Sequence, residues 1–150
     1  MGRSSAPGVR IRELAPGDLD RGLLDSLDAL RPASGADPGA VRRAYGEIRA
    51  NSNHVVAVAV YGGRVVGTAT LLVERKFIHD GGLAGHIEDV AVSAGHQGAR
   101  IGTMLVEYLL EVARGRGCYR TTLDCEEGLV GFYTRMGFER RGVQMRVDHR

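Results

Sequence analysis

A glycine-containing turn at residues 97–102 could bind a phosphate group. It reads Gln97-Gly98-Ala99-Arg100-Ile101-Gly102 and stands between an expected strand and the most regular expected helix of the chain. The first backbone N–H groups of a helix have no partner inside the helix, and the helix dipole attracts negative charge to them. Glycines also tighten ordinary strand-to-helix connections, so the motif alone leaves phosphate binding and a plain turn open.

Two other phosphate-binding motifs do not fit this turn. It lacks the lysine followed by serine or threonine that a nucleoside triphosphatase P-loop carries. Its glycines also lack the spacing of a dinucleotide-binding fingerprint, which has a later acidic residue for the ribose. The sequence therefore disfavours a nucleoside triphosphatase and a dinucleotide-dependent enzyme.

The elements before the turn begin with a short strand at residues 9–14 and two helices. The first helix is expected to begin at Gly17-Asp18 and the second at Asp37-Pro38, each followed by apolar residues at helical spacing. These apolar residues are Leu19, Leu23, Leu27 and Leu30 in the first helix and Val41, Ala44, Tyr45 and Ile48 in the second.

A hairpin and a crossover are expected to form the centre of the chain. Residues 54–61 and 64–75 read as antiparallel strands joined by Gly62-Gly63, and strand character returns at 86–92 after a glycine-rich loop at 77–85. A helix follows the turn, and its stripe is Ile101, Met104, Leu105, Tyr108, Leu109 and Val112. A strand at 119–124 completes a βαβ unit, which should be right-handed and leave its two strands parallel or splayed.

A short helix and two strands are expected to close the chain. Leu129, Phe132, Tyr133 and Met136 share one helical face, Gly137 ends the helix, and residues 138–141 and 143–147 read as strands. We therefore expect a single α+β domain over residues 1–150, with a mixed, mostly antiparallel sheet of about seven strands and about four helices.

The turn at Gln97 resembles the acetyl-CoA pyrophosphate loop of the GNAT N-acetyltransferases. Gln97 and Gly102 match the pattern of that loop, and Arg100 stands where glycine is usual. Longer strings over roughly residues 54–147 narrow the resemblance to the glucosamine-6-phosphate N-acetyltransferases. They are Lys76-Phe77-Ile78-His79, Gly85-His86-Ile87-Glu88-Asp89-Val90-Ala91-Val92, Gly117-Cys118-Tyr119-Arg120, Leu123-Asp124-Cys125, Phe132-Tyr133 and Gly137-Phe138.

The resemblance implies direct transfer of the acetyl group from acetyl-CoA to glucosamine 6-phosphate, for UDP-N-acetylglucosamine synthesis. The substrate residues it implies are Lys76, Phe77, Ile78, His79, Glu88, Asp89, Val90, Tyr119 and Arg120. The acetyl-CoA residues it implies are Val90, Ala91, Val92, Gln97, Gly98, Ala99, Arg100, Ile101, Gly102, Thr103, Asp124 and Tyr133.

Three of these residues have the chemistry that acetyl transfer needs. The sugar ammonium must lose a proton, and the CoA thiolate must be stabilised or protonated. By the resemblance, Glu88 accepts the proton or polarises the amine, Asp124 orients the amine or contacts the cofactor, and Tyr133 faces the sulfur. Because Tyr133 shares an apolar helical face, a core tyrosine is the alternative interpretation.

Cations could hold the phosphate of the sugar. Lys76, His79 and Arg120 are the candidates, although each alone reads equally well as a solvated charge, and His79 could instead pack on Phe77. His86 and His96 have no spacing typical of a metal site, so we interpret them as surface or packing histidines and expect no metal.

Composition narrows the range of partners. The formal net charge is +2, from 20 basic and 18 acidic residues, which does not favour nucleic-acid binding. No apolar run is long enough to cross a membrane, the start lacks a secretory pattern, and Ala6 replaces the hydroxyl residue of a myristoylation site. We expect a cytoplasmic protein, an organelle not being excluded, with Cys118 and Cys125 as free thiols.

The resemblance also implies a homodimer whose last strand reaches the partner and whose sugar pocket is shared. Val143, Met145 and Val147 alternate as such a strand should, although any edge strand alternates in the same way. Two alternatives remain for the function: a GNAT enzyme that acetylates another amine, such as a protein or a polyamine, and a non-catalytic CoA-binding regulator.

Overall fold

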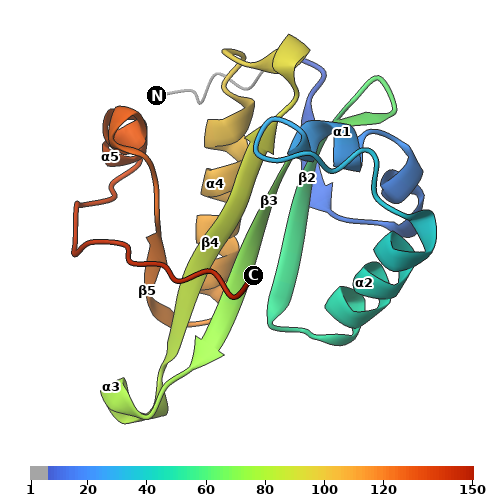
Figure 1. Cartoon of the computed structure of the whole chain (residues 1–150). Helices are drawn as coiled ribbons and strands as arrows, with labels where there is room; N and C mark the ends of the chain where they lie inside the picture. Colours follow the sequence, from blue (N-terminus) through green and yellow to red (C-terminus); the bar gives the residue numbers. More distant parts are fainter. Residues whose placement is uncertain (1–6) are drawn as a thin grey trace.

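A mixed β-sheet with helices on both faces forms the fold (Figure 1). The computed structural model describes residues 7–150, so the expectation on myristoylation at residues 1–6 lies outside the described residues. The strands are β1 (Arg10–Glu13), β2 (His54–Tyr61), β3 (Arg64–Arg75), β4 (Leu83–Val92) and β5 (Cys118–Leu123). The α-helices are α1 (Leu23–Leu27), α2 (Pro38–Ala50), α3 (Ile78–Gly81), α4 (Ile101–Gly115) and α5 (Val130–Thr134). Short 3-10 helices are η1 (Pro16–Asp20), η2 (Ala94–His96) and η3 (Glu127–Leu129).

The strands follow the order β1-β2-β3-β4-β5, and only β4 and β5 pair in parallel. This arrangement confirms the predicted α+β class and the predicted crossover from β4 through α4 to β5. The hairpin of β2 and β3 has the predicted bounds, and Gly62 and Gly63 both have positive φ, at 58° and 77°. Two residues with positive φ form the hairpin turn whose twist matches that of the strands.

The core lies between the sheet and α4. Leu105, Val106 and Leu109 of α4 are fully buried against Leu71 of β3 and Ile87 of β4. The predicted helical stripe that starts at Ile101 is therefore confirmed. It fixes the amino-terminal end of α4, and with it the glycine-containing turn, beside the end of β4.

The first predicted helix is wrong, because the chain divides it into η1 and α1. Gly22 separates the two with a φ of 103°, and a Cβ there would clash with the backbone oxygen of Val65. Asp18 is not the amino-terminal cap residue of η1, which is Ala15. Asp18 lies in the first turn, and its carboxylate accepts a hydrogen bond from the Ala15 N–H at 2.8 Å. The close approach of this segment to β3 breaks the helix, while Leu19, Leu23 and Leu27 still pack into one apolar cluster with Val58 and Val65.

The second predicted helix is confirmed as α2. Asp37 accepts a hydrogen bond from the Ala40 N–H at 2.8 Å, and Pro38 occupies the first turn. None of its residues is fully buried, and the predicted stripe is at most half-buried. Among residues 7–150, no helix has the length and apolar character that a membrane span requires.

The two strands predicted after Gly137 are not formed, so the sheet has five strands rather than about seven. Val143, Met145 and Val147 are 88%, 91% and 74% exposed. In Figure 1 this segment, drawn in red, leaves α5 and crosses in front of β5 and β4 without joining the sheet. A strand needs a neighbour for its backbone hydrogen bonds, and the segment has none within residues 7–150.

Candidate active site

The site is built where β4 and β5 stop pairing. Their last parallel pair is Ile87 with Leu123, after which β4 continues to Val92 while β5 has ended. The edge of β4 that faced β5 is therefore left without a β5 partner from Glu88 onward. Backbone N–H and C=O groups on such an edge can pair with an extended ligand.

A β-bulge bends β4 at this opening. Thr70 of β3 pairs with Glu88 but Thr68 pairs with Ala91, so β4 has one residue more than β3 across this interval. Asp89 absorbs the irregularity with a φ of 52°, which is unusual for a residue other than glycine. Bulges of this kind redirect neighbouring side chains, here those of Glu88 and Val90.

The glycine-containing turn joins the end of β4 to α4. Gly98 and Arg100 have positive φ, at 84° and 64°, and Arg100 is the amino-terminal cap of α4. The Gln97 side-chain amide donates a hydrogen bond to the backbone oxygen of Val92 at 3.1 Å. The turn thus presents the first N–H groups of a 15-residue helix, as the sequence predicts for an anion site.

The two ends of this turn have different roles in packing. The side chain of Ile101 belongs to the core and is 2% exposed, so only its backbone can face a ligand. A Cβ at Gly102 would lie 3.4 Å from Cζ of Phe132 and 3.8 Å from Cγ2 of Val92. The start of α4 is therefore adjacent to α5 and to the end of β4, and a longer side chain at Gly102 would fill the space between them.

Glu88 and Asp124 meet at the imidazole of His86. Nε2 of His86 lies 2.9 Å from Oε1 of Glu88 and 3.7 Å from Oδ2 of Asp124. Nδ1 of the same ring lies 2.8 Å from Oγ1 of Thr122. The structure therefore brings together the two predicted carboxylates and places between them a histidine that we interpreted as a surface or packing residue. The sequence signal was the pair His86 and Glu88, two residues apart on one face of a strand.

Tyr133 lies on α5 near Cys125 and is 7% exposed. Its ring makes edge contacts with Phe132 and Phe138, at centroid distances of 4.9 Å and 5.8 Å. Burial raises the pKa of the Tyr133 phenol, and the negative charge of a Cys125 thiolate raises it further. A phenol with a raised pKa keeps its proton at neutral pH and can donate it to a nearby anion.

The predicted phosphate-binding residues gather at the other end of β4 and β5. The rings of His79 and Tyr119 stack with centroids 4.0 Å apart, and the Arg120 guanidinium lies 5.4 Å from the Tyr119 ring centroid. Phe77 is fully exposed, so the alternative that His79 packs on it is wrong. Lys76 pairs with Glu74 at 3.0 Å.

These cations are separated from the carboxylates within one chain. Arg120 pairs with Ala84, and Glu88 lies four residues further along β4, or about 13 Å at the rise of a strand. The structure therefore forms two clusters from the predicted substrate residues. One surrounds Glu88 at the opening between the strands, and the other surrounds Tyr119 near α3.

A cleft of about 830 Å³ runs along β5. Its lining includes Tyr119 and Arg120 at one end, Asp124 and Tyr133 at the other, and Gln144 from the carboxyl-terminal segment. The volume lies in the range of small-molecule sites.

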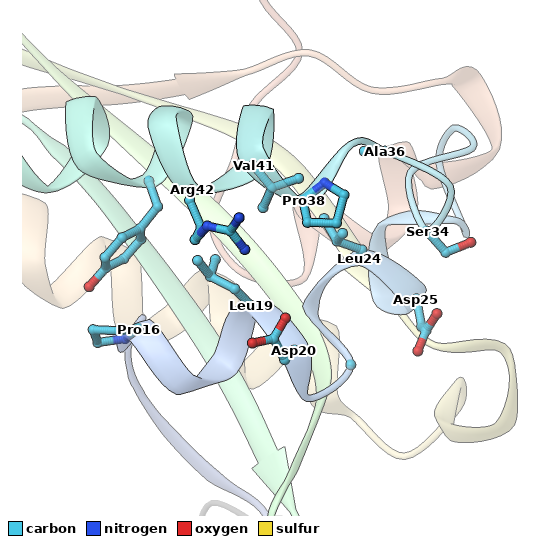
Figure 2. A pocket seen from close by; sticks show the side chains of 12 residues that line it. Pro16, Leu19, Asp20, Leu24, Asp25, Ser34, Ala36, Pro38, Val41 and Arg42 are labelled. Carbon is cyan, nitrogen blue, oxygen red and sulfur yellow. The ribbon is translucent and has the colours of Figure 1, made fainter.

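A second cavity of about 460 Å³ lies between η1, α1 and α2 (Figure 2). Figure 2 shows the Arg42 side chain directed from α2 towards Leu19 and Asp20 on η1. This cavity shares no lining residue with the cleft along β5, and none of the residues predicted for the site lines it. The sequence patterns gave no indication of it.

Comparison with known proteins defines the class. Residues 23–138 match the acetyltransferase (GNAT) family, and the chain belongs to that family. Its sheet, opened between β4 and β5 above a helix that begins in a glycine-containing turn, is the acetyltransferase fold of that family.

More particular relatives are glucosamine 6-phosphate N-acetyltransferases, which confirms the resemblance found in the sequence. The chain is 42% identical to glucosamine 6-phosphate N-acetyltransferase 1 of Oryza sativa subsp. japonica, over 91% of this chain and 84% of the relative. It is 35% identical to the Dictyostelium discoideum protein of the same name, over 93% and 90%. The crystal structure of the Arabidopsis thaliana enzyme superposes with a TM-score of 0.91 at 30% identity, covering 95% of this chain and 99% of that one.

Proposed function

We infer that this protein transfers the acetyl group of acetyl-CoA to the amine of glucosamine 6-phosphate. The relatives with that printed name support the substrate, because they align over nearly the whole chain. The observation that carries the chemistry is the meeting of Glu88 and Asp124 at the end of the β4–β5 pairing, in the opening at whose far end α4 begins.

Acetyl-CoA would bind at the opening of the sheet. Its pyrophosphate would accept hydrogen bonds from the N–H groups at the start of α4, in the turn that contains Gly98 and Gly102. Its extended pantetheine arm would pair with the backbone of β4 between Val90 and Val92. The thioester would then lie between the carboxylates and Tyr133.

The reaction would be a direct transfer in a ternary complex. The sugar nitrogen attacks the thioester carbon, the C–S bond breaks, and the amine proton passes to Glu88 or to a water that Glu88 holds. Asp124 would orient the amine, and Tyr133 would donate its phenolic proton to the departing thiolate. The high pKa that burial gives to Tyr133 fits a group that must be protonated when the thiolate forms.

A homodimer would complete the sugar site. Arg120, His79 and Lys76 would hold the phosphate, but within one chain they lie about 13 Å along the strand from Glu88. The outer edge of β5 has no paired strand within residues 7–150, and the alternating segment Val143 to Val147 is exposed. A second copy of this chain, its last segment pairing along β5, would cover both surfaces and bring its own cations to the shared pocket.

The experiment is a thiol-release assay with acetyl-CoA and a panel of amines, combined with light scattering at micromolar concentration. Glucosamine 6-phosphate should release CoA fastest, and a peptide with a free amino terminus and spermidine should release it slowly. Faster CoA release with the peptide or with spermidine would show that this amine, and not glucosamine 6-phosphate, is the acceptor. Binding of acetyl-CoA without CoA release would indicate a non-catalytic regulator. A monomer at micromolar concentration would contradict the shared site.

A further inference from the structure

The imidazole of His86 is in contact with three polar side chains at the opening of the sheet. Its Nε2 faces Glu88 on the same strand and Asp124 beyond the end of β5, and its Nδ1 faces Thr122 on β5. His86 and Thr122 are directly paired across the parallel strands. The ring therefore connects both strands immediately before they part.

The chemistry of these partners fixes the hydrogen on the ring. Ionised carboxylates only accept hydrogen bonds, so Nε2 must carry a hydrogen to bind Glu88 at 2.9 Å. Thr122 can either donate to Nδ1 or accept from it, which permits a neutral or a charged ring. Thr122 thus orients the imidazole, in the way that a second hydrogen bond commonly fixes a histidine tautomer.

We propose that His86 is a positioning residue, which fixes the Glu88 carboxylate at the acceptor site through its Nε2–H and, from 3.7 Å, attracts the Asp124 carboxylate towards the same nitrogen. Two carboxylates close together repel each other, and an N–H group between them offsets that repulsion. His86 is the basic side chain that pairs with both carboxylates, with Nε2 at 2.9 Å from Glu88 and 3.7 Å from Asp124.

The functional consequence rests on the proposed function, because it concerns an amine placed between the carboxylates. With both carboxylates ionised and oriented, the pocket would attract the sugar ammonium and accept its proton. Loss of the Nε2–H would leave the repulsion between the carboxylates without this offset and let them turn apart. The effect should appear with the sugar and not with acetyl-CoA.

Two substitutions of His86 test whether the hydrogen bond from Nε2, and not only the volume of the ring, matters. His86→Gln keeps an N–H donor at the position of Nε2, whereas His86→Asn keeps the reach to Thr122 but falls short of the carboxylates. We expect His86→Asn to lower kcat/KM for the sugar about tenfold, the size of one hydrogen bond to a charged group. His86→Gln should recover most of this loss, and the KM for acetyl-CoA should change in neither variant.

An unchanged kcat/KM for the sugar in His86→Asn would overturn the proposal, as would equal losses in the two variants. Nitrogen-15 NMR of the histidine rings tests the same geometry without any substrate, so it remains decisive if the sugar proves not to be the acceptor. The His86 ring should carry hydrogen on Nε2 at pH 8, and Thr122→Val should alter its signals while Thr121→Val, on the opposite face of β5, should not. A ring protonated on Nδ1 alone would also overturn the proposal.

Discussion

Ile87 of β4 and Leu123 of β5 form the last parallel pair of the sheet, and the next residue after each of them carries a carboxylate. Glu88 follows Ile87, and Asp124 follows Leu123. The end of the strand pairing thus determines where both acids lie. Because α4 begins at the far end of the same opening, a cofactor bound at its amino terminus would point its reactive end towards these acids.

Gly102→Glu should abolish acetyl-CoA binding. The new side chain would fill the space between Phe132 and Val92, and its carboxylate would repel the pyrophosphate at the start of the helix. Isothermal calorimetry measures the loss, and Gly115→Glu, at the other end of α4 with no atom near its Cβ, is the matched control. Equal affinity of wild type and Gly102→Glu for acetyl-CoA would mean that the turn is not the cofactor site.

Tyr133→Phe should lower kcat by about 10²-fold with little change in either KM, since a hydrogen bond present only in the transition state is removed. Steady-state kinetics and a thermal melt separate the two interpretations of this residue. A normal kcat with a lower melting temperature would make Tyr133 a packing residue of α5. Tyr108→Phe is the control, because that half-buried tyrosine lies on α4 near Glu13 of β1.

Arg120→Ala should raise the KM for glucosamine 6-phosphate by about tenfold, because a charge-assisted contact to the phosphate is lost, and leave acetyl-CoA binding unchanged. Arg49→Ala, at the exposed end of α2, should change neither value. An unaltered sugar KM in Arg120→Ala would mean that Arg120 does not bind the phosphate and is a solvated charge packed on Tyr119.

Asp18→Asn should destabilise the fold by about 2 kcal/mol at pH 7, because Asp18 accepts two hydrogen bonds from the Arg12 guanidinium, at 2.7 Å and 2.9 Å. Those bonds lower the pKa of the Asp18 carboxyl in the folded protein. The stabilisation is therefore present above the unfolded pKa of about 3.9 and is lost as the pH falls through the lower folded value. Denaturant unfolding should show a difference from wild type at pH 7 that shrinks below pH 4.

The control for that measurement is Asp20→Asn, in the same 3-10 helix but exposed. It should leave stability nearly unchanged at both pH values. A difference between Asp18→Asn and wild type that is as large at pH 3 as at pH 7 would show that the carboxylate charge is not its cause.

Local patterns predicted the parts of the fold that depend on neighbours in sequence. The turn at Gly62-Gly63 and the apolar stripe of α4 follow from residues within a few positions of one another, and both are confirmed. The break at Gly22 was missed because it depends on the approach of Val65, which no local periodicity reveals. The segment from Val143 to Val147 has the alternation of a strand but no partner within the described chain.

In the candidate site too, local sequence suggested some features, whereas others depend on contacts between distant segments. From its own residues the turn at Gln97 and Gly102 suggested either an anion site or a plain turn, whereas the roles of Glu88 and Asp124 came from the family resemblance. His86 was missed because its contacts arise from the register of β4 against β5, which pairs it with Thr122. The roles of all these residues in binding and catalysis stay predictions.

The most direct test of the central claim compares kcat/KM for glucosamine 6-phosphate and for unphosphorylated glucosamine, at saturating acetyl-CoA. The two sugars present the same amine to Glu88 and Asp124 and differ only in the phosphate that Lys76, His79 and Arg120 are proposed to hold. We predict that the phosphorylated sugar is preferred by at least about 10²-fold, the value of one or two charge-assisted contacts. Equal values for the two sugars would contradict the substrate while leaving the acetyltransferase family intact.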